Sequence, residues 1–152
     1  MERWLAIDHG TQRLGLAMGT QTDGIASPLE VIPADPPQAA MDKLAAVIED
    51  YAITGIVVGW PLNMDDTEGP QGRMTRAYAI DLAARFGLDV RMWDERLSSF
   101  QADQTLAGQM TRKKRKARQD AIAAAAFLQD FFSSGGPEGA PRPDELGPTE
   151  TP

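Results

Sequence analysis

The sequence predicts an α/β domain built on a five-stranded mixed sheet. Two apolar, strand-length segments (residues 3–10 and 13–20) precede a third strand, and beyond residue 35 helical periodicity alternates with further strands. Adjacent short strands favour antiparallel hairpins, whereas strands separated by helices favour parallel crossovers. The 152 residues, 42% of them hydrophobic, are enough for one domain with its own core.

The first three strands are expected to form an antiparallel meander. The turn-prone sequence HGTQ joins the first two segments, so Asp8 comes at the end of the first strand. The third strand, GIASPLEVI, contains Pro28, which has no amide proton for a central ladder. We therefore expect the third strand to lie at an edge of the sheet.

Helical periodicity starts after the third strand. Asp35, Pro36 and Gln38 form a capping-box pattern at a helix start. The apolar face predicted for this first helix consists of Met41, Leu44, Ala45 and Ile48. After the helix, the continuous apolar run TGIVVGWP, residues 54–61, is typical of a strand buried on both faces.

The second half of the chain continues this alternation. A second helix is predicted from about Pro70 to the stop signal Gly87, and the last strand covers residues 88–95. A short capped helix is expected at residues 98–106. The alanine-rich segment 119–132 has strong helix propensity, and its small side chains permit close packing of its backbone.

The two ends of the predicted domain differ in character. Residues 1–133 are expected to form the folded domain, and the acidic, Pro- and Gly-rich residues 134–152 a disordered tail.

The chain has no cysteine, which excludes disulfides, a thiol nucleophile and thiolate zinc sites. With no apolar stretch of ~20 residues and no signal-peptide pattern at its start, the chain is expected to be cytoplasmic and to have no membrane partner.

Charge is distributed unevenly along the chain. The formal net charge is −7, which argues against nucleic-acid binding through the overall field of the protein. Six of the fifteen basic residues fall within residues 112–118, which we interpret as a loop before the last helix. Nucleic-acid binding would therefore depend on this basic loop.

Acids stand at three unusual places: Asp8 at the end of the first strand, Asp94 and Glu95 at the end of the last, and Asp120 at the start of the alanine-rich helix. Each alone has an ordinary explanation as a turn residue, a solvated strand end or a helix-dipole partner. If these ends share one edge of the sheet, the three carboxylates converge. Like charges ~4 Å apart repel by roughly 4 kcal/mol at an effective dielectric constant near 20, so the cluster must take up protons or bind a cation.

Oxygen ligands of this kind suit Mg²⁺ or Mn²⁺ better than zinc. Two such ions ~4 Å apart would activate a water molecule and stabilise the leaving oxygen in phosphodiester hydrolysis. The residues therefore point to a metal-dependent hydrolase of phosphodiesters.

Four ordered motifs also carry a resemblance: AIDHGTQRLGLAMG, IVVGWPLNMDDTEGP, DERLSS and RKKRKARQDAIAAAAFL. Over residues 3–132 the chain resembles the YqgF/RuvX family of pre-16S rRNA nucleases, relatives of RuvC-type Holliday-junction resolvases with an RNase H-like fold. The resemblance implies processing of the 5′ end of pre-16S rRNA in ribosome biogenesis. The catalytic and metal-binding residues that it implies are Asp8, Glu95 and Asp120.

The resemblance also implies the residues that contact nucleic acid. Thr11 and Arg13 lie in the turn after the first strand, where they would touch a phosphate. The basic residues that would bring nucleic acid to the acids are Lys113, Arg115 and Lys116. Resolvases of this type take their second acid from the strand whose counterpart here ends in Gly59, Trp60 and Pro61.

Several alternatives remain open from the sequence. The substrate could be branched DNA, which would require a dimer to cut two symmetry-related strands, and the chain is expected to be a monomer or weak homodimer. A non-catalytic module that binds RNA, a ribosome-assembly factor or the transcription machinery is a second alternative. The sequence after Asp8 also looks like a phosphate loop of actin-like ATPases, which need two such domains. His9 is a candidate general base.

Overall fold

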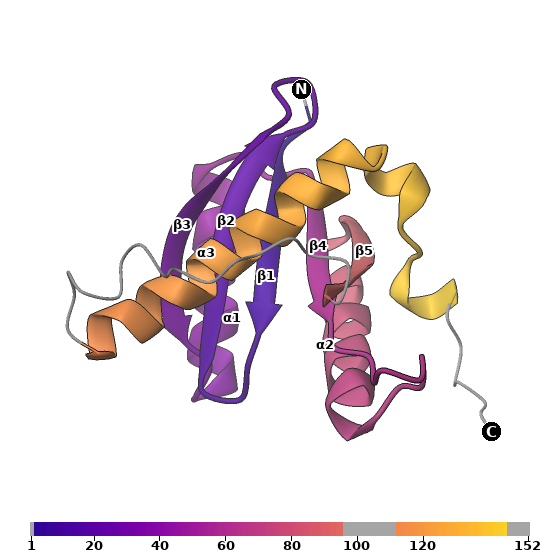
Figure 1. Cartoon of the computed structure of the whole chain (residues 1–152). Coiled ribbons are helices and arrows are strands. Elements are labelled where there is room, and N and C mark those ends of the chain that lie inside the picture. Colours follow the sequence, from indigo (N-terminus) through magenta and orange to yellow (C-terminus); the bar gives the residue numbers. More distant parts are fainter. Residues whose placement is uncertain (1, 96–111, 146–152) are drawn as a thin grey trace.

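The structure, a computed structural model, describes residues 2–95 and 112–145 and contains the expected five-stranded mixed sheet (Figure 1). The strand order is β3-β2-β1-β4-β5, in which β2 pairs antiparallel with both β1 and β3, and β4 pairs parallel with both β1 and β5. The strands are β1 (Trp4–His9), β2 (Arg13–Thr20), β3 (Ile25–Pro33), β4 (Gly55–Trp60) and β5 (Asp89–Asp94). The helices are α1 (Pro37–Asp50), α2 (Pro70–Phe86) and α3 (Arg112–Ser133).

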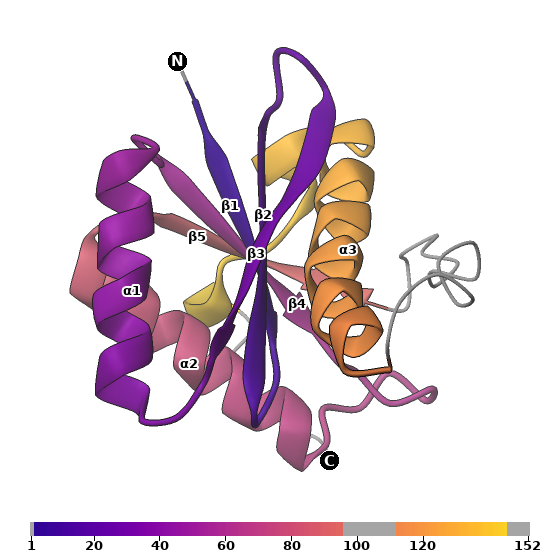
Figure 2. The same ribbon diagram turned by 90° about the vertical axis from the view of Figure 1, so that its left-hand side faces the viewer.

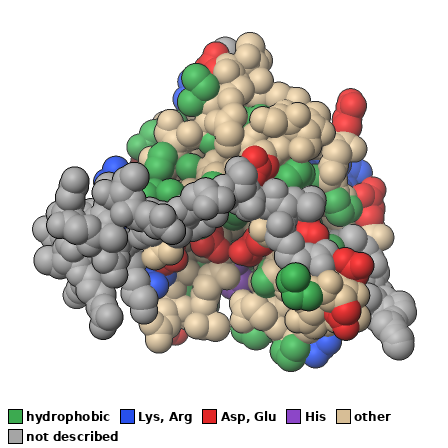
Figure 3. Space-filling view, in the orientation of Figure 1, with side chains coloured by type: hydrophobic (Ala, Val, Ile, Leu, Met, Phe, Trp, Pro, Cys, Tyr) green, Lys and Arg blue, Asp and Glu red, His purple; other side chains and the backbone are tan. Residues whose placement is uncertain are grey.

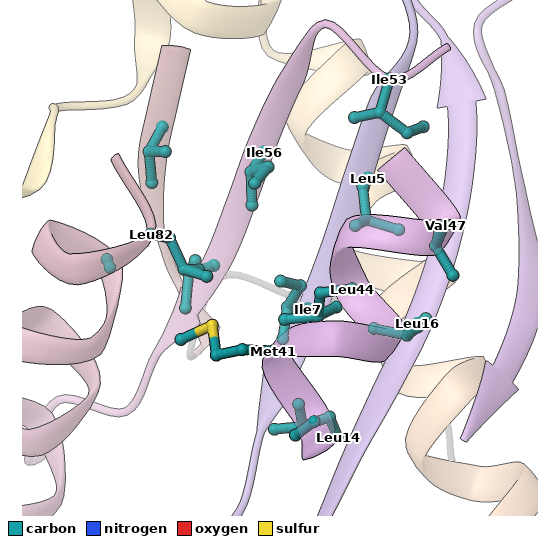
Figure 4. Close-up of a cluster of buried hydrophobic side chains, with 14 of the residues drawn as sticks. Leu5, Ile7, Leu14, Leu16, Met41, Leu44, Val47, Ile53, Ile56 and Leu82 are labelled. Atoms are coloured by element: carbon teal, nitrogen blue, oxygen red, sulfur yellow. The ribbon is translucent and has the colours of Figure 1, made fainter. Parts of the chain in front are cut away.

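Helices cover both faces of the sheet. Figure 2 shows α1 and α2 on one face and α3 crossing the other. Because successive strand residues point to opposite faces, Leu5 and Ile7 of β1 face α1 and α2, whereas Trp4 and Ala6 face α3. Figure 4 shows the core on the side of α1 and α2, which includes Met41, Leu44 and Leu82. The core on the side of α3 includes Leu128 and Phe131.

Most predicted elements are confirmed. The third strand is the edge strand β3, and Pro28 lies next to an irregularity in its pairing with β2, between Leu16 and Ala17. β4 is central and its side chains are buried on both faces, as the apolar run predicted. α2 ends at Gly87, which adopts the left-handed conformation with φ 64° that favours glycine.

The start of α1 differs from the prediction. The helix begins at Pro37, and Pro36 is the N-cap residue without a side-chain hydrogen bond, so the capping box at Asp35 is wrong. On its inner face Val47 is buried, whereas Ala45 is exposed. A proline is well suited to the first helical turn without a cap, because its missing amide proton would have no partner there.

The start of α3 is a second correction. The basic run of residues 112–118 is not a loop, because its backbone forms the first turns of α3. Lysine and arginine are good helix formers, and no glycine or proline interrupts the chain between residues 112 and 133. The helix predicted at residues 98–106 lies outside the described residues. Within the described part of the chain, no helix is long and apolar enough to span a bilayer.

The C-terminal extension is more ordered than the disordered tail expected for residues 134–152. Two short 3-10 helices, Gly136–Gly139 and Pro143–Glu145, follow α3. The amide of Met92 in β5 donates a hydrogen bond of 2.8 Å to the Pro141 carbonyl, and Figure 1 shows the extension running beside β5. Composition alone did not predict these contacts. Through them the extension covers the outer edge of the sheet. The last seven residues lie outside the described part of the chain.

Arg91 of β5 ties the extension to the sheet. Its Nη1 donates to the carbonyls of Pro137 at 2.6 Å and Ala140 at 2.9 Å, and its Nε donates to Asp89 at 2.7 Å. We expect Arg91→Met to lower the free energy of unfolding by about 1–3 kcal/mol, because it leaves these acceptors without their donor. Urea denaturation measures the loss, and limited proteolysis should cut the extension faster.

Arg85→Met is the matched control for this prediction. Arg85 forms an exposed pair with Asp81 at 3.5 Å on α2, and such pairs contribute little. The control should stay within about 0.5 kcal/mol of the parent protein. Equal stability losses in the two variants would contradict the anchoring role of Arg91.

Candidate active site

The ends of β1 and β5 bring two of the predicted acids to one edge of the sheet. Both strands pair parallel with β4, so their carboxyl ends point the same way. Asp8 shares the strand face of Trp4 and Ala6, and the same alternation from Trp93 places Glu95 on that face too. This face is the one that α3 covers. Figure 3 shows acidic side chains gathered near the middle of this side of the molecule.

Glu95 lies over the end of β4 because Gly59 has no side chain. A Cβ at position 59 would lie 2.9 Å from Glu95 Oε2 and 3.0 Å from its Cγ. The resemblance to resolvases pointed to this strand as the usual source of the second acid. Here the carboxylate that occupies the space above β4 comes from the next strand along the sheet.

Asp120 reaches the same region from α3. A Cβ at Gly15 of β2 would overlap the Asp120 carbonyl group and lie 2.8 Å from the Ala121 nitrogen. The helix backbone therefore rests directly on the strand at this point, and Gly15 permits it. The sequence predicted close packing through the alanines of the helix, but it missed that a glycine on the strand makes the contact possible.

The carboxylates of the site influence one another. Burial, and then the charge of Asp120, raises the pKa of Asp8 from 3.8 to about 6. Burial also raises the pKa of Glu95 from 4.5 to about 7, with further contributions from the charges of Asp8 and Asp94. Asp8 thus interacts with both other predicted acids, and ionising Asp8 and Glu95 costs free energy in the metal-free protein.

Arg13 pairs with the third acid. Its Nε donates to Asp120 Oδ2 at 2.7 Å, and the two side chains are 37% and 27% exposed. In residues 2–95 and 112–145, no three His, Asp or Glu side chains stand together as a complete group of metal ligands. The donor set nevertheless suits a hard cation, because partly buried carboxylates that repel one another gain most from a positive ion.

A polar recess opens beside these residues. It has a volume of about 220 Å³, and the turn from Gly10 to Arg13 forms one wall, closed by a 3.0 Å hydrogen bond from the Gly10 amide to the Arg13 carbonyl. The recess brings together four of the predicted site residues. Its lining consists of Asp8, Gly10, Thr11, Gln12, Arg13 and Asp120.

The predicted basic contacts are only partly placed. The backbones of Lys113, Arg115 and Lys116 belong to α3, and their side chains lie outside the described part of the structure. Asp120 follows Lys116 by four residues, about one turn of the same helix. The basic run and the third acid are therefore parts of one helix, where the sequence predicted a loop leading into a helix.

His9 lies on the opposite face of the sheet from Asp8. Its ring stacks on Tyr78 of α2 with centroids 4.1 Å apart, and its Nδ1 lies 3.3 Å from Thr75 Oγ1. Burial lowers the pKa of His9. The structure therefore places the candidate general base in the contact between β1 and α2, away from the carboxylates.

A buried ion pair between the loop after β4 and α2 was missed from the sequence. The Glu68 carboxylate is 1% exposed and accepts hydrogen bonds from Arg76 Nε at 2.8 Å and Trp60 Nε1 at 3.0 Å. These contacts fasten the loop after β4 to α2. Trp60 and Arg76 each lie eight residues from Glu68, and this spacing has no regular secondary-structure period that would have revealed the network.

Comparisons with known proteins find relatives that match most of the chain. The RuvX family model, described as Holliday junction resolvase, matches residues 2–134. A protein of Geobacillus thermodenitrificans is 39% identical over 135 residues, which cover 87% of this chain and 98% of the relative. A protein of Opitutus terrae is 39% identical over 145 residues, covering 94% and 99%. Both relatives bear the name "Putative pre-16S rRNA nuclease".

Two solved structures with a similar fold are described as resolvases of Holliday junctions or as complexes with them. RuvC of T. thermophilus in complex with a Holliday junction substrate has a TM-score of 0.55 at 15% identity, covering 88% of this chain and 95% of that one. The fowlpox virus Holliday junction resolvase has a TM-score of 0.53 at 9% identity, covering 87% and 98%. These likenesses confirm the predicted RNase H-like fold of the RuvC type. With a family match over nearly all of the described residues and relatives at 39% identity, the chain belongs to the RuvX family of nuclease-type proteins.

Proposed function

We propose that this protein is a metal-dependent nuclease that processes the 5′ end of pre-16S rRNA in the cytoplasm. The observation that carries the proposal is that Asp8 interacts with both Glu95 and Asp120, with the pKa of Asp8 and of Glu95 raised. The choice of RNA as substrate is supported by the name of the relatives that match over most of their length.

The three carboxylates would hold Mg²⁺ or Mn²⁺, and two bound ions would supply an activated water and stabilise the leaving oxygen. Thr11 and Arg13 would contact the phosphate, because both line the recess next to Asp8. The hydrogen bond from the Gly10 amide to the Arg13 carbonyl closes the backbone turn that carries these two residues. The residues proposed for metal binding and for phosphate contact would all act from the edge of the sheet or from α3.

The test compares substrates under a titration of Mn²⁺. End-labelled RNA that extends beyond the mature 5′ end of 16S rRNA and a four-way DNA junction are incubated separately with the protein, with EDTA as the metal-free control. We expect metal-dependent cleavage of the RNA and little of the junction. Paired symmetric cuts in the junction would favour a resolvase, and metal-independent binding without cleavage of either substrate would favour a non-catalytic module of the ribosome-assembly or transcription machinery.

The basic start of α3 provides a separate prediction. Replacing Lys113, Arg115 and Lys116 by glutamine should weaken binding to RNA and flatten its salt dependence. The slope of log K against log salt should fall by up to about 0.9 for each duplex phosphate that the protein no longer neutralises. Fluorescence anisotropy at several salt concentrations measures both effects. An unchanged slope would show that these residues are only a solvated part of the helix.

A further inference from the structure

The ion pair between Arg13 and Asp120 lines the recess beside Asp8. Arg13 Nε donates to Asp120 Oδ2 at 2.7 Å, across 107 residues of sequence, and both side chains line the recess. In this pair Asp120, one of the three carboxylates proposed to bind the cation, is already bonded to Arg13, the arginine proposed to bind the phosphate.

These two assignments compete. A guanidinium and a divalent cation are both positive, so they repel each other when they share one carboxylate. Arg13 has five N–H donors in a planar fork, which bind a phosphate in the same way as they bind a carboxylate. A phosphate of the substrate is thus an alternative acceptor for the arginine.

We propose that Arg13 couples binding of the nucleic-acid phosphate to binding of the divalent cation. In the free protein Arg13 occupies the Asp120 carboxylate and weakens cation binding. When a phosphate enters the recess, Arg13 turns to it and releases Asp120 to the cation. The inference rests on the proposed nuclease function, because it assumes that these acids hold a metal ion.

The backbone around the pair favours a side-chain switch over a larger motion. Asp120 sits where the backbone of α3 rests on Gly15, so the helix holds the Asp120 main chain in place. Arg13 begins β2 and pairs with Pro33 of β3, which holds its main chain within the sheet. Both side chains are partly exposed at 37% and 27%, so they exchange partners without opening the core.

The coupling is reciprocal and is measured as a change in cation affinity. Isothermal titration of Mn²⁺ into the full chain is performed with and without a 2′-O-methyl RNA hairpin, whose integrity is checked on a gel. In the parent protein we expect the hairpin to raise the Mn²⁺ affinity about 10-fold. In Arg13→Gln we expect Mn²⁺ to bind about 10-fold more tightly without RNA, and the hairpin to add little.

Two further variants complete the experiment. Arg85→Gln removes the same charge at a distant, exposed pair and should leave both titrations unchanged. Arg13→Lys keeps the charge and should retain most of the weak Mn²⁺ binding of the free parent protein. Thermal denaturation of each variant confirms that it is folded.

The outcomes separate this inference from the proposed function. If the parent protein binds Mn²⁺ and Asp8→Asn does not, but Arg13→Gln binds Mn²⁺ no more tightly than the parent, the coupling is wrong and the metal site stands. If Mn²⁺ binds neither alone nor with RNA, the metal site and the coupling are both wrong.

Discussion

Asp8→Asn is expected to remove metal-dependent cleavage and, at the same time, to stabilise the metal-free protein at alkaline pH. The activity should fall at least about 100-fold, because asparagine has no negative charge to bind the cation. Rates measured on the 5′-extended RNA at saturating Mn²⁺ test this loss. Equal activities of the parent and the variant would contradict a catalytic role for Asp8.

The stability of Asp8→Asn at alkaline pH should increase, whereas its activity should fall. Folding raises the pKa of Asp8 from 3.8 to about 6, so the folded state binds this proton more tightly than the unfolded state. The associated stability is complete below pH 4 and is lost as the pH rises through about 6. The loss amounts to about 3 kcal/mol at pH 8, and asparagine avoids it because it does not ionise.

Urea denaturation in EDTA between pH 4.5 and pH 8 measures this difference. The unfolding free energy of Asp8→Asn minus that of the parent protein should rise with pH across this range. Asp42→Asn on the exposed side of α1 is the control and should show a nearly constant difference. A constant difference for Asp8→Asn as well would show that Asp8 is not held in an environment that disfavours its charge.

Gly15→Ala is the second prediction with a large effect. The added Cβ would overlap the Asp120 carbonyl and press on the Ala121 nitrogen at 2.8 Å, and both are backbone atoms that cannot turn aside. The helix α3 must therefore shift away from β2. Its side chains Phe127, Leu128 and Phe131, which are buried, would have to move with it. We expect a loss of about 3 kcal/mol or more in unfolding free energy.

The shift should also separate Asp120 from Asp8 and lower the affinity for Mn²⁺. Urea denaturation and Mn²⁺ titration measure the two effects. Gly69→Ala is the matched control, because the atoms nearest to a Cβ there belong to the side chain of Asn63, at 3.2 Å or more, and a side chain can move. Its cost should stay near 1 kcal/mol or below. A Gly15→Ala protein as stable as this control would contradict the close contact between α3 and β2.

The sequence by itself determined the order of the elements and the candidate acids. The two apolar segments on either side of the turn after Asp8, the apolar run of β4 and the stop at Gly87 are local patterns, and each predicted its element correctly. The sequence predicted that Asp8 and Glu95 come close only on the condition that their strands end at the same edge of the sheet, and both strands do pair parallel with β4.

Other features depended on contacts between distant parts of the chain. Composition predicted a disordered tail after α3, but the donors of Arg91 and the Met92 amide order residues 136–145 along β5. The density of charge before Asp120 predicted a loop, although the residues of the basic run individually favour helix. In both cases polarity is a poor guide, because polar residues form regular structure wherever their backbone finds partners.

The details of the site were decided only by the tertiary structure. Glu95 lies over Gly59 and Asp120 next to Gly15 because glycines in the sheet leave room there, and only the strand register and the path of α3 show which glycines these are. Burial, and then the charge of Asp120, raises the pKa of Asp8, and Asp120 also pairs with Arg13; both interactions of Asp120 are with residues more than 100 positions away. The sequence determined which residues were available for a metal site. Their burial, mutual repulsion and competition for partners depend on distances through space that no local pattern contains.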